Sequence, residues 1–74
     1  MIKKDEDGKF VMVNKEKFYI GEDLDETIDD VLNLINSLSA TEKIAQKYED
    51  DEIIEITNKK IEFYSAVLKE IYES

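Results

Sequence analysis

The fold is decided by residues 17–38, KFYIGEDLDETIDDVLNLINSL, where a strand pattern gives way to a helix pattern. The first four of these residues are β-prone, and Gly21 closes the run. Asp23, followed three residues later by Glu26, is typical of a helix N-terminus. The apolar side chains beyond it recur with helical periodicity and fall in one arc: Leu24, Ile28, Val31, Leu32, Leu34, Ile35 and Leu38. An amphipathic helix is therefore predicted over 23–38.

The residues before this helix predict an antiparallel β-hairpin or three-stranded meander over 2–20. Asp7-Gly8 favours a two-residue turn, because both residue types tolerate positive φ. A second turn is expected at 14–16. The strands are expected at 2–6, 9–13 and 17–20, and the first of them is polar.

The residues after it predict one or two further helices, at about 40–49 and 52–73. Ser39-Ala40-Thr41-Glu42 has the capping-box pattern of a helix start. The last segment is apolar over about half of its circumference. If residues 41–73 formed one straight helix, Ile44 and Ile53 would lie on opposite sides. We therefore expect a break or kink near 49–52.

Together these patterns predict a single α+β domain over 1–74, with a β region at 1–21 and a helical region at 22–74 that holds two to three helices. A chain of 74 residues builds only a small core, and it contains no cysteine that could add a disulfide or thiolate metal site. Oligomerisation or support from a partner is thus more expected than for a larger domain, while the 42% of hydrophobic residues is enough for the small core of a monomer. No apolar run is long enough to span a membrane, and the polar, acidic start is unlike a secretory signal, so we expect a cytoplasmic protein.

The net charge is −9, and it is unevenly distributed. Residues 1–20 hold five lysines and four acids, whereas residues 21–74 hold five lysines and fifteen acids. Because affinity for phosphate backbones comes mainly from lysine and arginine, direct binding to nucleic acid or to anionic membranes is disfavoured. A protein partner with a basic surface is expected instead.

Two acidic clusters are the candidate partner-binding surface. Carboxylates at the start of the first helix compensate its dipole in the ordinary reading. There are more carboxylates than compensation of the dipole requires, and like charges four residues apart destabilise a helix. They could also imitate a nucleic-acid backbone, or hold a metal, although no metal site is assigned. The predicted surface comprises Glu22, Asp25, Glu26, Asp29, Asp30, Glu49, Asp50, Asp51 and Glu52.

The sequence offers few of the residue types that carry catalysis. Histidine and cysteine are absent, and the serines have no evident activating base. Two glycines are too few for a phosphate-binding loop. We therefore expect a protein that is not an enzyme and binds no cofactor.

The apolar stripe of the last helix has two readings. It forms the central core element, packed by the first helix on one flank and by the sheet on the other. Alternatively, part of it faces a second copy of the chain or another partner. The candidate residues for that face are Ile56, Phe63, Val67 and Ile71.

Two functions follow from these surfaces. The first is a small acidic inhibitor or regulator that occupies a basic nucleic-acid-binding groove of a host protein. In size and charge the chain is similar to many anti-CRISPR proteins and other nucleic-acid mimics of phages and mobile elements. The alternative is a homodimeric assembly module or chaperone-like adaptor that uses the apolar face of the last helix. In its hairpin followed by acidic helices the chain resembles some phage tail-assembly accessory proteins.

Overall fold

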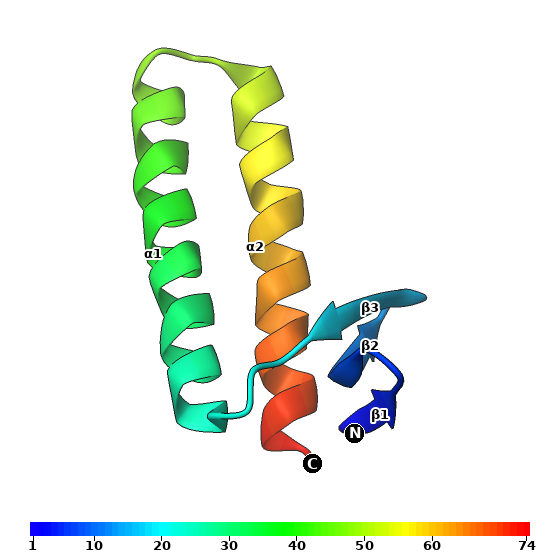
Figure 1. Cartoon of the computed structure of the whole chain (residues 1–74). Helices are drawn as coiled ribbons and strands as arrows, with labels where there is room; N and C mark the ends of the chain where they lie inside the picture. Colours follow the sequence, from blue (N-terminus) through cyan, green and yellow to red (C-terminus); the bar gives the residue numbers. More distant parts are fainter.

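A computed structural model describes all 74 residues as a three-stranded antiparallel meander followed by a helical hairpin (Figure 1). The strands are β1 (Lys3–Asp5), β2 (Gly8–Val13) and β3 (Glu16–Tyr19), with β2 in the middle of the sheet. The helices are α1 (Leu24–Lys47) and α2 (Asp51–Tyr72). The predicted α+β fold, with its meander before the helices, is confirmed.

The turn between β2 and β3 has the geometry that hairpins favour. Asn14 and Lys15 lie between the paired residues Val13 and Glu16. Both central residues have positive φ, 52° and 70°, which fits a type I′ turn and matches the twist of the strands.

The turn between β1 and β2 lies one residue earlier than predicted. Asp5 pairs with Gly8, so Glu6 and Asp7 form the turn, and only Gly8 has a positive φ, 131°. The Oδ1 atom of Asp5 accepts a hydrogen bond from the Asp7 N–H at 2.8 Å. This side-chain turn replaces the positive-φ pair that the sequence pattern favoured.

A single helix, α1, spans the two segments predicted at 23–38 and 40–49, so the helix start predicted at Ser39–Glu42 is wrong. The Thr41 hydroxyl donates to the Ser37 carbonyl at 3.0 Å, as hydroxyls do within a helix. No glycine or proline stands near this segment to end the preceding helix. The capping-box pattern therefore lies inside a continuous helix.

The break predicted near 49–52 is confirmed as the turn between α1 and α2. Glu49 adopts the left-handed conformation with φ 55°. The Asp50 N–H donates to the Ala45 carbonyl at 2.9 Å and the Glu49 N–H to that of Gln46 at 3.2 Å, which is the Schellman pattern. The Asp50 carboxylate then accepts from the Ile53 N–H at 3.3 Å and caps α2.

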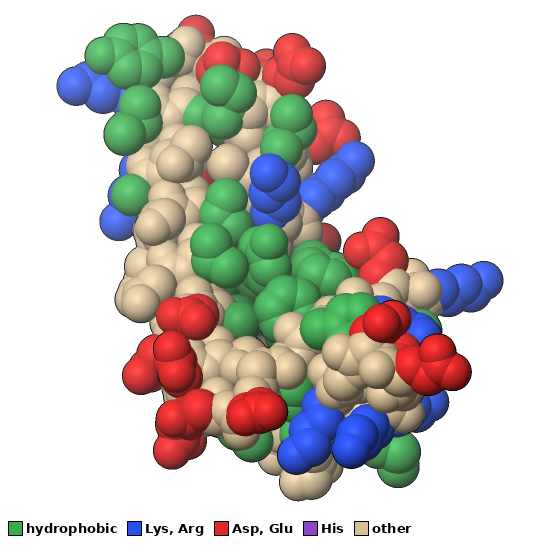
Figure 2. All heavy atoms as spheres, viewed as in Figure 1, with side chains coloured by type: hydrophobic (Ala, Val, Ile, Leu, Met, Phe, Trp, Pro, Cys, Tyr) green, Lys and Arg blue, Asp and Glu red, His purple; other side chains and the backbone are tan.

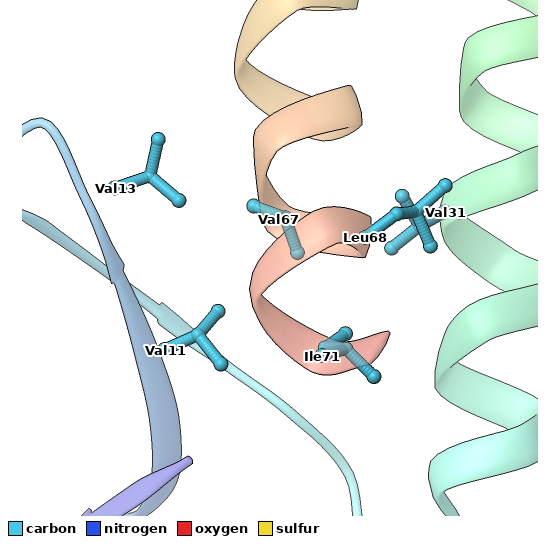
Figure 3. Close-up of a cluster of buried hydrophobic side chains, with 6 residues drawn as sticks. All are labelled: Val11, Val13, Val31, Val67, Leu68 and Ile71. Carbon is cyan, nitrogen blue, oxygen red and sulfur yellow. The ribbon is translucent and has the colours of Figure 1, made fainter. Parts of the chain in front are cut away.

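Helix α2 is the central element of the core, as the first reading of its apolar stripe predicted. Figure 3 shows Val67 directed toward the sheet residues Val11 and Val13, while Leu68 meets Val31 of α1. Ile71 completes this cluster of six buried side chains. The sheet and α1 thus pack on different sides of the C-terminal half of α2.

The helical hairpin extends well beyond the sheet (Figure 1). We call residues 38–60 the tip of the hairpin and the remainder, including the sheet, the base. In the tip only the small side chains of Ala45 and Thr57 are buried. Neither helix has the length and apolar character needed to cross a membrane.

Candidate acidic binding site

The charges of the chain are separated in space as well as in sequence. Figure 2 shows acidic side chains gathered at the start of α1, while lysines surround the neighbouring sheet. Residues 18–42 hold seven acids and not one lysine. None of these acids forms an ion pair, although Lys4 and Lys9 of the sheet line a neighbouring hollow together with Glu22.

The start of α1 is fixed by a short hydrogen-bond network. The Asp23 carboxylate accepts from the Glu26 N–H at 3.2 Å and caps the helix. The Thr27 hydroxyl oxygen accepts from the Gly21 N–H at 2.9 Å and donates to the Asp23 carbonyl at 3.1 Å. A Cβ on Gly21 would lie only 3.2 Å from that hydroxyl, so the close approach favours glycine. The network ties the end of β3 to the first turn of α1.

A shallow cleft of about 500 Å³ lies between this first part of α1 and β3. Phe18, Val31 and Leu34 provide apolar lining, and Tyr19 and Thr27 lie among them. Four carboxylates line the same cleft: Glu22, Asp23, Glu26 and Asp30. No lysine lines it, and none of these carboxylates forms an ion pair. The arrangement presents negative charge beside an apolar surface.

The fold therefore brings only some of the predicted acidic residues together in the cleft. Glu26 and Asp30 of α1 line the cleft, together with Glu22, which lies just before the helix. Asp25 and Asp29 are exposed but do not line it, because the helical period directs them to another flank. The apolar lining from β3 was not predicted, since the strand and the helix meet only in the folded chain.

The second acidic cluster lies at the opposite end of the hairpin. Glu49 and Asp50 lie in the turn between the helices, and Asp51 and Glu52 begin α2 (Figure 1). A helix of 24 residues is about 36 Å long at ~1.5 Å per residue, so the two clusters do not form one continuous surface. The helix cap of Asp50 and the first-turn positions of Asp51 and Glu52 give these acids a structural role.

The four residues proposed for an oligomer face differ in how far the fold buries them. Val67 and Ile71 are buried in the core, so they are not accessible to a partner, which corrects that part of the predicted face. Phe63 is half-buried, with its ring 6.3 Å from that of Phe18. Ile56 remains 47% exposed. The sheet is the reason, because it covers the stripe at the base and leaves it open at the tip.

A third group of charges stabilises the outer face of the sheet. Lys17 donates to Asp5 at 2.8 Å and lies 4.7 Å from the centroid of the Phe10 ring. Tyr19 also donates to Asp5, at 2.8 Å. These donors, Lys17 foremost, lower the pKa of Asp5 to about 2, and the same ion pair raises the pKa of Lys17. Phe10 is buried beneath this group, so its role is packing.

No cluster of three or more acidic side chains is arranged to hold a metal ion. Comparison with protein-family models, with curated proteins and with solved structures finds no match to this chain. The most distinctive feature of the surface is the acidic cleft between α1 and β3.

Proposed function

We propose that the chain is a small, non-catalytic regulator that binds a basic surface of a protein partner through the acidic cleft. The observation that carries this proposal is the lining of the cleft, in which four carboxylates without ion pairs stand beside apolar side chains. Lysine and arginine match both parts of it, because their stems are apolar and their ends are cationic.

The spacing of the carboxylates suggests which basic surface is recognised. Glu26 and Asp30 stand four residues apart on α1, and Glu22 continues this line of carboxylates just before the helix begins. The Cβ atoms of residues at this spacing lie ~6 Å apart on a helix. That interval is comparable with the separation of phosphates along a nucleic-acid strand. A groove that binds nucleic acid would accept this row of charges and would then be closed to its own ligand.

The proposed mechanism is thus competitive occupation of a nucleic-acid-binding groove. The uncompensated charge would also speed association, since electrostatic steering raises the rate of encounter between oppositely charged surfaces. Phages and mobile elements direct small acidic inhibitors of this kind at host proteins, and we propose that the chain is an anti-CRISPR-like inhibitor of this class.

The test begins with a tagged chain used to capture partners from a host lysate and eluted with a salt gradient. The partner is then purified, and its affinity is measured for two variants with equal charge change: Glu26→Gln with Asp30→Asn inside the cleft, and Asp25→Asn with Asp29→Asn outside it. We expect the first variant to lose about tenfold or more in affinity, and the second to lose much less.

Two further readings sharpen this test. Affinity should fall as salt rises, because exposed charges are screened. A competition assay with the partner's own nucleic acid should show mutual exclusion. Equal losses for the two variants would mean that only net charge matters, and would refute the cleft as the site.

A further inference from the structure

Strand β3 forms an open edge of the sheet, because only its inner side pairs with β2. The Ile20 N–H donates to the Lys9 carbonyl at 2.9 Å, which directs the backbone of Ile20 toward β2. The backbone groups of successive residues in a strand alternate between its two sides. The backbone of Phe18 therefore also faces β2, whereas the N–H and C=O groups of Lys17 and Tyr19 point away from the sheet.

These outward backbone groups of β3 have no hydrogen-bond partner within the chain. An unpaired edge accepts a further strand unless short length, charged side chains or a bulge obstructs it. The other edge, β1, is obstructed, since it has 3 residues and includes the exposed lysines Lys3 and Lys4. On β3 the Lys17 side chain is directed across β2 to Asp5 of β1, with its ammonium 2.8 Å from that carboxylate, and so leaves the open edge free. Strand β3 is therefore the edge that can accept a strand.

The open edge of β3 adjoins the acidic cleft. Phe18 and Tyr19 line the cleft from the strand, and Leu34 lines it from α1. A further hollow of about 340 Å³ continues along α1 and includes Asp30 and Leu34. The space beside the end of β3 therefore has backbone hydrogen-bonding groups on the strand and carboxylates on the helix.

The helices lie behind the position that an added strand would take. Val67 of α2 packs against β2, and Phe63, about one turn earlier, lies with its ring 6.3 Å from that of Phe18 of β3. Because one helical turn and the distance between neighbouring strands are both about 5 Å, a strand beyond β3 would lie over the next turn of α2, at Lys60. Lys60 forms no ion pair. Basic side chains are thus favoured at the α1 end of an added strand and disfavoured at its α2 end.

The helical hairpin distinguishes between an isolated segment and a second copy as the added strand. Two copies that paired through β3 would be related by a two-fold axis perpendicular to the joined sheet, which places both hairpins on the same face. Each hairpin extends past β3 on that face, so the two would collide (Figure 1). A single extended segment meets no such obstacle.

We propose that the partner binds as an extended segment, which adds to β3 as a fourth strand and places lysine or arginine side chains in the acidic cleft. The outward backbone groups of Lys17 and Tyr19 would pair with the segment, and Glu26 and Asp30 would bind its basic side chains. The apolar stems of those side chains would pack on Phe18, which lines the cleft. This inference rests on the function proposed for the cleft and adds the conformation of the bound element.

The probe is a short synthetic peptide in which lysine and valine alternate in one half, and threonine and valine in the other. Its control has the same sequence, but the two central amides, one on each edge, carry N-methyl groups that prevent strand pairing. Titration of the full chain measures the affinity of each peptide. Hydrogen exchange followed by NMR measures the Lys17 and Tyr19 amides, with the Phe18 amide, which already faces β2, as an internal reference.

We expect the unmodified peptide to slow exchange of the Lys17 and Tyr19 amides about tenfold or more and to leave that of Phe18 nearly unchanged. The N-methylated control should bind about tenfold more weakly, because backbone pairing is lost at equal charge. Equal affinities for the two peptides, unchanged exchange at Lys17 and Tyr19, or a failure of both peptides to bind would overturn the added strand. The function proposed for the cleft would survive any of these results if the captured partner still lost affinity for the variant with Glu26→Gln and Asp30→Asn.

Discussion

The base and the tip of the helical hairpin are built from the same two helices, yet they differ in what covers them. At the base, α2 packs on the sheet through Val67 and on α1 through Leu68, and both side chains are buried. At the tip, α2 has only α1 beside it, and the largest buried side chain is Thr57. An apolar stripe therefore predicts that a helix face will be covered, but it does not identify the covering element.

The difference has an energetic consequence. At the base, the apolar side chains of α2 are buried against both the sheet and α1. At the tip they can be buried only against α1, so less apolar surface is removed from water. A pair of helices without a third layer is marginal, because most helix stability in proteins comes from tertiary packing. The tip should therefore open locally before the base unfolds.

The largest effect is expected from a matched pair of truncations on α2. Ile71→Ala removes a side chain that is 4% exposed and should destabilise the chain by about 2–4 kcal/mol, through lost burial and a cavity. Ile56→Ala removes one that is 47% exposed and should cost less than about 1 kcal/mol in the monomer. Urea unfolding at low protein concentration measures both.

Equal losses for the two truncations would contradict the comparison between base and tip. If Ile56→Ala became costly only at high protein concentration, the loss would instead report self-association, because the stability of an oligomer depends on concentration.

A smaller effect of opposite sign is expected in the turn at the tip. Glu49 has φ 55°, a conformation that costs an L-residue roughly 1–2 kcal/mol and costs glycine almost nothing. Glu49→Gly should therefore stabilise the chain by about 0.5–1 kcal/mol, after allowing for the extra entropy of glycine in the unfolded chain. Thermal unfolding measures the gain.

Glu49→Gln is the control for this substitution, because it removes the same charge and keeps the side chain. It should leave the melting temperature nearly unchanged. A gain as large as that of glycine would assign the effect to charge repulsion between Glu49 and the three acids that follow it, and would reject the backbone explanation.

The strands and the helical periods could be predicted from local patterns because each pattern reports on local geometry. The α1–α2 turn was located by phase, since the apolar faces of its two flanks do not align. The boundary at Ser39–Glu42 was predicted wrongly because the same residue pattern occurs inside helices, where the Thr41 hydroxyl bonds back to Ser37. The end of α1 depends on Glu49 in a left-handed conformation, which its residue type does not indicate.

The acidic site was predictable only in part. Sequence spacing identified Glu26 and Asp30, but their separation from Asp25 and Asp29 depends on where β3 packs against α1. The distance between the two acidic clusters is set by the full length of α1. The sequence pattern divided this helix in two, because it predicted a helix start at Ser39–Glu42. Long-range placement of this kind arises from packing between elements and leaves little trace in local patterns.

The smallest effect, and one specific to the base, concerns Asp5 on the outer face of the sheet. Its pKa is lowered from 3.8 to about 2, chiefly by the Lys17 hydrogen bond, with further donation from Tyr19 and the Asp7 N–H. A carboxyl with a lowered folded-state pKa stabilises the fold fully above its unfolded pKa, and this contribution is lost as the pH falls. The Asp5 contribution should therefore be complete above about pH 4 and lost toward pH 2.

Urea midpoints of the wild type and Asp5→Asn, compared from pH 6 to pH 2, measure this contribution. The variant should be less stable at pH 6, and the difference should shrink as the acid limit is approached. The pKa of Glu70 is lowered by the N-terminal ammonium, and because that pair is present in both proteins its effect cancels in the difference. A constant difference across the range would show that Asp5 acts through neutral hydrogen bonding in the turn, since only the ionised form is favoured by Lys17.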